Sequence, residues 1–189
     1  PMIGAQLVNA TYNVVDRIYI GAIPGYGALP LTGVGLTYPL IALITAFANL
    51  CGMGGAPLMS IARGEGRNEH AERILGTAAA LLLGLSAVLL VLGYLYMEPL
   101  LWMFGASEST IGYATDYFSI YLVGTPFVLL TLGLNPFVTS QGFARTGMMT
   151  ILIGAVANIL LDPLFIFVFN MGVRGAAIAT VISQFLCVP

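Results

Sequence analysis

Two aspartates lie inside long apolar segments of this sequence, and each has carboxamide side chains on its own helix face. Gln6, Asn9, Asn13 and Asp16 are spaced by three, four and three residues. At 100° per residue, these four side chains fall within about 60° of one another on a helix. They form one polar stripe on an otherwise apolar helix. Such a stripe must face protein or water rather than lipid.

The second aspartate repeats this pattern later in the sequence. Asn158 and Asp162 are four residues apart and share a helix face. Pro163 follows at once, so we expect a bend there and the loss of the backbone N–H that would bond a carbonyl one turn earlier. Thr180 and Ser183 add hydroxyls on a similar face of the next helix. An amide, a carboxylate and a loose carbonyl suit a hard cation or a proton relay.

The composition shows which elements must carry these residues. Charged residues make up 7% of the 189 residues, hydrophobic residues make up 59%, and lysine is absent. An ordinary globular protein has about 25% charged residues, so this chain cannot cover a soluble fold with polar surface. Four runs contain no Asp, Glu, Lys, Arg or His: residues 18–62, 75–97, 117–144 and 163–173. Because a helix needs about 20 apolar residues to cross a bilayer, the sequence predicts an integral membrane protein.

We expect an all-α bundle of six membrane-spanning helices, in a fragment of a longer chain truncated at both ends. The expected helices cover residues 1–23, 32–62, 74–97, 111–140, 148–169 and from 176 onward. The main loops are expected at residues 63–73 and 98–110. Four arginines fall in the loops after the second and fourth helices: Arg63, Arg67, Arg73 and Arg145. The positive-inside rule places these loops, and with them the N-terminus, in the cytoplasm.

Several function classes are disfavoured by the same composition. With six arginines and a net charge of −2, the chain lacks the basic surface that nucleic-acid binding needs. Cys51 and Cys187 lie far apart in apolar runs, so neither a disulfide nor a metal cluster is indicated. A membrane-embedded enzyme would need a nucleophile–base pair or a metal cluster within the spans, and no His or suitable Cys lies there. A purely structural subunit would have no use for buried acids.

Several motifs resemble the multidrug and toxic compound extrusion (MATE) family of transporters. Residues 12–21 (YNVVDRIYIG) are similar to the first-helix motif of the family, and residues 33–39 (GVGLTYP) to a segment soon after it. Residues 101–106 (LWMFGA) look like the loop before the fourth helix. Residues 158–163 (NILLDP) and 175–180 (GAAIAT) resemble the fifth and sixth helices. The resemblance covers essentially the whole chain.

This resemblance implies twelve helices in two six-helix lobes, related by a pseudo-twofold axis along the membrane normal. The chain would be most of the N-terminal lobe, residues 1–189, with the C-terminal lobe absent. The resemblance also implies a cation site for H⁺ or Na⁺ at four positions: Asp16, Asn158, Asp162 and Thr180. Pro1 matches the proline at which the first helix bends in some members, and Asn9 takes a position that some members fill with Gln.

We therefore expect a secondary antiporter of the cell membrane, not an enzyme, that exports organic and often lipophilic cationic compounds. The exchange would be against inward H⁺ or Na⁺, with no cofactor, in a full-length protein that is a monomer. Two carboxylates in a low-dielectric cavity repel each other and should titrate as a coupled unit. The alternative is a lipid-linked oligosaccharide flippase of the same superfamily, which would need basic residues in its cavity. Arg17 is the only arginine well inside a span, which argues against this alternative.

Overall fold

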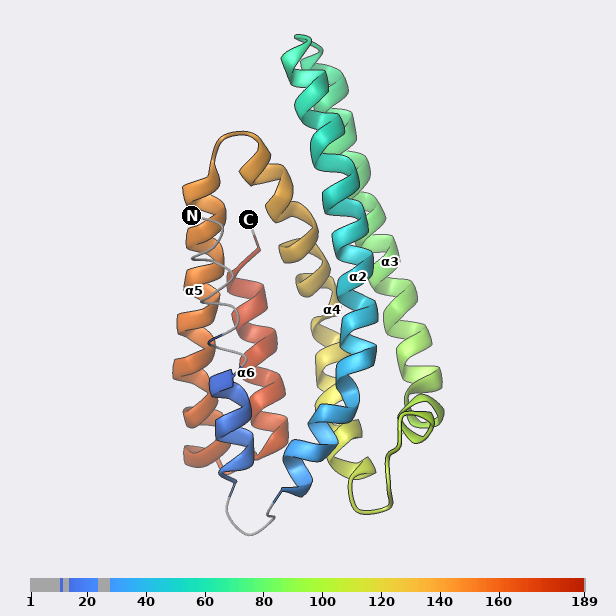
Figure 1. Cartoon of the computed structure of the whole chain (residues 1–189), viewed down its shortest axis with the longest axis vertical. Helices are drawn as coiled ribbons and strands as arrows, with labels where there is room; N and C mark the ends of the chain where they lie inside the picture. The colour runs from blue at the N-terminus through green and yellow to red at the C-terminus, as the bar shows by residue number, and fades with distance from the viewer. Residues whose placement is uncertain (1–10, 12–13, 24–27, 189) are drawn as a thin grey trace.

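The computed structural model describes residues 11, 14–23 and 28–188, and this part of the chain is built from helices. Residues 14–21 belong to the first helix, drawn in blue in Figure 1. The following elements are α2 (Leu29–Gly64), α3 (Asn68–Met103), α4 (Ile111–Ser140), α5 (Ala144–Pro163), the π-helical turn η1 (Leu164–Val168) and α6 (Val173–Leu186). The expected all-α bundle is confirmed. Pro1, Gln6, Asn9 and Asn13 lie outside the described residues.

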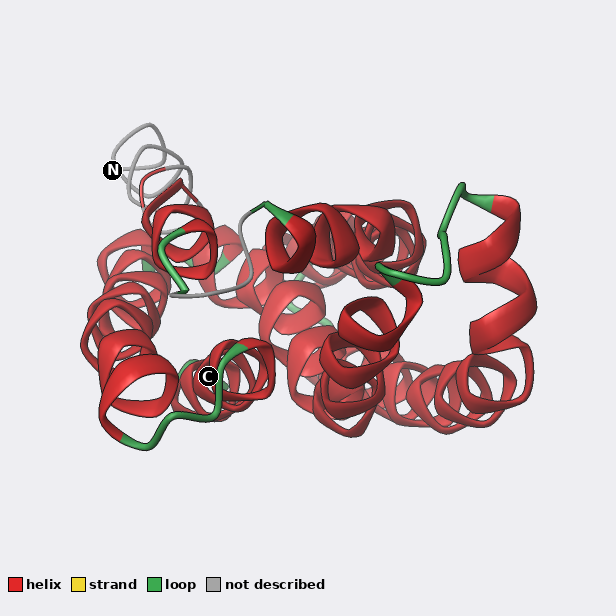
Figure 2. Ribbon diagram, turned by 90° about the horizontal axis from the view of Figure 1, so that it is seen from below, coloured by secondary structure: helices red, strands yellow, loops and turns green. Residues whose placement is uncertain are grey.

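Four helical segments among the described residues are long and apolar enough to cross a membrane: Leu29–Gly64, Asn68–Met103, Ile111–Ser140 and Ala144–Val168. The helix Val173–Leu186 is apolar but shorter. The bounds of α4 match the expected helix at residues 111–140. Seen from below, most of the helices are viewed close to end-on, so their axes run in roughly the same direction (Figure 2).

The charged loop expected at residues 63–73 is wrong, because most of this segment is helical. Only residues 65–67 separate α2 from α3. Each of these helices has 36 residues, about 54 Å at 1.5 Å per residue. That length exceeds the 40–45 Å of a bilayer with its head groups. The tip of this helical hairpin projects beyond the other helices at the top of Figure 1, where exposed charged residues with good helix propensity continue the helices.

The loop expected at residues 98–110 is also too long. α3 continues through Pro99 to Met103, which leaves residues 104–110 between α3 and α4. A side chain satisfies one backbone group of this connection, since the Thr110 hydroxyl accepts a hydrogen bond from the backbone N–H of Ser107 at 2.9 Å. Leu101, which the expected loop would have exposed, is fully buried against the core.

The central helix is α4, which packs against α2, α3, α5 and α6. Leu122, Leu129 and Phe137 on its faces are at most 1% exposed. Small residues set the closest approaches: a Cβ on Gly52 of α2 would lie 2.8 Å from the carbonyl oxygen of Gly133 of α4. Close backbone contact at small residues is the usual way in which membrane helices pack. This packing leaves a space between α2 and α4 on one side and the first helix, α5 and α6 on the other.

Candidate cation site and cavity

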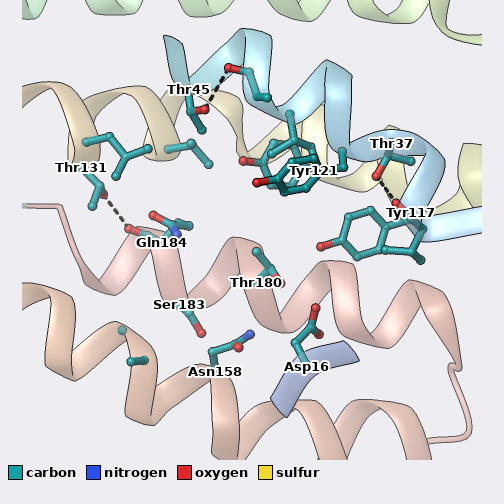
Figure 3. Close-up of a pocket in the computed structure, with 18 of the residues that line it drawn as sticks. Asp16, Thr37, Thr45, Tyr117, Tyr121, Thr131, Asn158, Thr180, Ser183 and Gln184 are labelled. Carbon is teal, nitrogen blue, oxygen red and sulfur yellow. Dashed lines mark hydrogen bonds between the residues drawn. The ribbon is translucent and has the colours of Figure 1, made fainter. Parts of the chain in front are cut away.

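A cavity of about 630 Å³ occupies the space between these five helices. Asp16, Asn158, Thr180 and Ser183 line it from the first helix, α5 and α6, and Figure 3 shows all four side chains in its wall. These are the polar residues that the sequence placed on shared helix faces. Helices far apart in the sequence therefore bring their polar faces together, since none of those faces can be turned toward lipid.

Asn158 lines this cavity from α5, and Asp162 lies next to it on the same helix. Asn158 is 1% exposed and Asp162 is fully buried. The Nδ2 amide of Asn158 donates a hydrogen bond to Oδ1 of Asp162 at 3.2 Å, the contact that a spacing of four residues allows on a helix. Asn158 lines the cavity directly, and the Asp162 carboxyl stands behind it.

Asp16 of the first helix reaches the same place. Its carboxyl group lies within hydrogen-bonding reach of the Asp162 carboxyl. The first and fifth helices thus meet at two acidic groups, in the place that the polar faces of the sequence predicted. Two negative charges in contact repel each other strongly in a dry environment. A proton or a cation between the two carboxyl groups removes that repulsion.

Four buried oxygen atoms in and beside the cavity have no hydrogen-bond partner within the described part of the chain: Asp16 Oδ1, Asn158 Oδ1, Asp162 Oδ2 and Gln184 Oε1. All four are acceptors. A buried acceptor without a donor costs about 1–3 kcal/mol. A set of acceptors with no donor to satisfy them fits a cation or a proton-donating ligand.

The α6 hydroxyls add further oxygen atoms. Thr180 Oγ1 donates to the carbonyl of Ala176 at 3.0 Å, and Ser183 Oγ donates to the carbonyl of Ala179 at 2.7 Å. Because each hydroxyl donates its hydrogen bond to its own helix, its oxygen lone pairs can still accept from, or bind, a group in the cavity. Together with the two carboxylates and the side-chain oxygen of Asn158, these hydroxyls offer oxygen ligands. Hard cations such as Na⁺ prefer oxygen ligands. The described residues include no cluster of three or more His, Cys, Asp or Glu that suits a transition metal.

The backbone of α5 changes geometry directly after Asp162. Pro163 is the last residue of α5, and the five residues of η1 form a π-helical turn in which the Phe169 N–H bonds the Leu164 carbonyl at 3.0 Å. π-helical turns are rare and occur frequently at functional sites. The sequence predicted a disruption at Pro163 but not this form of it. The start of α6 fits closely against the turn, because a Cβ on Gly175 would lie 2.7 Å from the Phe165 carbonyl oxygen.

The structure adds cavity residues that the sequence patterns did not single out as site residues. Gln184 follows Thr180 by one helical turn, so its place on the same face was readable. Tyr38 of α2 with Tyr117 and Tyr121 of α4 also line the cavity, but aromatic residues are common on all faces of membrane helices. Among the residues that the structure describes, Arg17 is the only arginine that lines the cavity.

Long apolar helices around a polar cavity with buried acids are the architecture of a membrane transporter. The family model MatE matches residues 1–164. The chain is 30% identical over 186 residues to the multidrug export protein MepA of Staphylococcus haemolyticus, which covers 97% of this chain and 40% of that protein. It is 30% identical over 176 residues to the FAD transporter of Shewanella oneidensis, with 91% of this chain and 38% of that protein covered.

A solved structure described as the MATE transporter ClbM in complex with Rb⁺ aligns with a TM-score of 0.86 and 35% identity. The alignment covers 100% of this chain and 42% of that one. The chain therefore belongs to the MATE family of membrane transporters and is a multi-pass membrane protein. It spans about 40% of the length of the relatives that it matches.

Proposed function

We propose that this chain is the N-terminal lobe of an antiporter that exports organic compounds in exchange for H⁺ or Na⁺. The observation that carries the proposal is the contact between the Asp16 and Asp162 carboxyl groups beside a cavity with unsatisfied acceptors. Two similar proteins support an ion-coupled exporter. One is named a multidrug export protein, and the other was solved in complex with Rb⁺. The C-terminal lobe would complete the transport pathway.

The proposed mechanism uses charge repulsion to couple the ion to the first helix. When both carboxylates are charged and empty, their repulsion favours separation of the first helix from α5. An ion arriving from outside lets the two groups close, bends the first helix and shrinks the cavity, so substrate is released outward. One charge crossing 100 mV of membrane potential supplies about 2.3 kcal/mol. That energy is enough to bias a lobe with two nearly balanced conformations.

The orientation follows from the loop arginines. We propose that the tip of the α2–α3 hairpin and the α4–α5 connection lie in the cytoplasm with the N-terminus, because both connections carry arginine. The protein would reside in the cell membrane and work as a monomer. Its substrates would be small organic compounds, lipophilic cations among them, held in the cavity between α2, α4 and α6.

The experiment is dye efflux from proteoliposomes that contain the full-length protein, with pH and Na⁺ gradients imposed independently. The proposal predicts that at least one inward ion gradient drives dye outward against its own gradient. Equal flux with and without either gradient would show a passive pathway and overturn antiport. Protein-free liposomes and liposomes with dissipated gradients are the matched controls.

A further inference from the structure

Arg17 places an unusual charge at the mouth of the cavity. Its guanidinium lies 5.5 Å from the ring centroid of Tyr38, and both residues line the cavity. Tyr38 is 58% exposed, so the pair stands at the rim rather than in the core. Tyr38 is nine residues into α2, about 14 Å along the helix axis from Leu29. The guanidinium is therefore held beside α2 and does not reach out past the N-terminal end of that helix.

A charge within a membrane segment calls for a carboxylate partner, and no ion pair among the described residues includes Arg17. The ion pairs in the described part of the chain join Arg67 to Glu65 and Arg174 to Asp116. The charge of Arg17 acts on Asp16, its neighbour in sequence, but the Asp16 carboxyl group interacts with the Asp162 carboxyl group rather than forming an ion pair with Arg17. Contact with the Tyr38 ring is weaker than an ion pair and leaves the planar N–H fork of the guanidinium open to a second ligand. An intramembrane arginine in this situation is a candidate for ligand binding.

The rest of the cavity is divided by chemistry. Asn158 and Gln184, which also line it, carry unsatisfied acceptors. The Tyr117 and Tyr121 rings stack with centroids 6.3 Å apart and planes inclined by 17°, and Figure 3 shows both rings in the same cavity as Asp16 and Asn158. An aromatic wall thus lies in one chamber with a guanidinium group and a set of unsatisfied acceptors. Such a chamber complements a planar ligand with an anionic group on one side.

We infer that Arg17 forms an anion subsite at the cavity rim, which selects planar aromatic substrates carrying a carboxylate or a phosphate. This inference rests on the proposed function, and it specifies, among the small organic substrates proposed above, planar compounds with an anionic group. The guanidinium binds carboxylate and phosphate alike through paired N–H donors. The Tyr38 ring, over which the guanidinium lies, holds it in place while the N–H groups bind the anion.

The test is equilibrium binding to the full-length protein in detergent, with no ion gradient. One probe pair is a xanthene dye with a free carboxylate and the methyl ester of the same dye. The second pair is flavin mononucleotide and riboflavin, which differ by one phosphate. The two pairs show whether the subsite takes a carboxylate, a phosphate or both. The variants are Arg17→Gln, Arg17→Lys and, as the matched control, Arg174→Gln, whose arginine lies outside the cavity.

Arg17→Gln is expected to raise the Kd of at least one anionic probe about tenfold to a hundredfold, the range of a charge-assisted hydrogen bond. The neutral partner of that pair should change less than about twofold. Arg17→Lys should restore part of the discrimination, and Arg174→Gln should match the wild type. Equal weakening of both members of each pair, or no change in either, would overturn the inference. Because binding needs no gradient, probe discrimination without ion-driven flux would count only against the proposed antiport.

Discussion

Neutralising Asp162 is predicted to remove the stabilisation that the coupling ion gives to the fold. Asp162 is fully buried, accepts a hydrogen bond from Asn158 at 3.2 Å and faces the Asp16 carboxyl. Asp162→Asn keeps the size of the side chain but removes one of the two facing charges. An ion at a hundred times its dissociation constant stabilises the state that binds it by about 2.7 kcal/mol. The wild type should show a gain of that order, and Asp162→Asn should show almost none.

The assay is thermal unfolding of the full-length protein in detergent, titrated with Na⁺ at fixed pH and with acid at fixed Na⁺. We expect the melting temperature of the wild type to rise with whichever ion fills the site, whereas that of Asp162→Asn stays flat. Asp116→Asn is the control, because its carboxylate pairs with Arg174 outside the cavity. If Asp162→Asn kept the full ion-dependent rise, the ion would bind elsewhere and the reasoning would be refuted.

Three further substitutions separate ion binding from packing. Thr180→Val removes a cavity hydroxyl while keeping the shape of the side chain. In the same titration, we expect ion binding to be weaker by about threefold to tenfold. An unchanged ion affinity would show that Thr180 is not part of the site. Gly154→Ala places a methyl group against Cys187 and 3.2 Å from the Ser183 carbonyl, so it should destabilise the α5–α6 contact by about 1–3 kcal/mol, seen as a lower melting temperature with or without ions. Asn135→Ala loses hydrogen bonds to the Gly147 carbonyl at 2.9 Å and to Thr150 at 3.2 Å; the expected loss is about 0.6–2 kcal/mol of stability with the ion titration intact, and a lost ion response would contradict a purely structural role.

Much of the fold was predictable because apolar runs and polar faces obey separate physical limits. A charge-free apolar run of 20 or more residues is typical of a membrane-spanning helix, and the helix at residues 111–140 was predicted with its observed ends. The polar face with Asn158 and Asp162 could be read from spacing alone. Its meeting with Asp16 followed from the rule that such faces cannot meet lipid.

The features that were missed depend on what the sequence pattern does not encode. The helix ends around residues 63–73 were wrong because a helix does not stop where the bilayer stops. The π-helical turn after Pro163 depends on how α6 packs against it, with Gly175 in close contact. The placement of Arg17 beside Tyr38 depends on the relative position of two helices, which no single-helix periodicity can give.

The central claim is that Asp16 and Asp162 together carry the coupling ion. Its most direct test is gradient-driven efflux by the full-length protein with Asp16→Asn, Asp162→Asn and Asp116→Asn compared at equal amounts in proteoliposomes. We predict that both site variants lose ion-driven efflux, whereas Asp116→Asn exports dye at the rate of the wild type. Wild-type coupled efflux in both site variants would contradict the assignment.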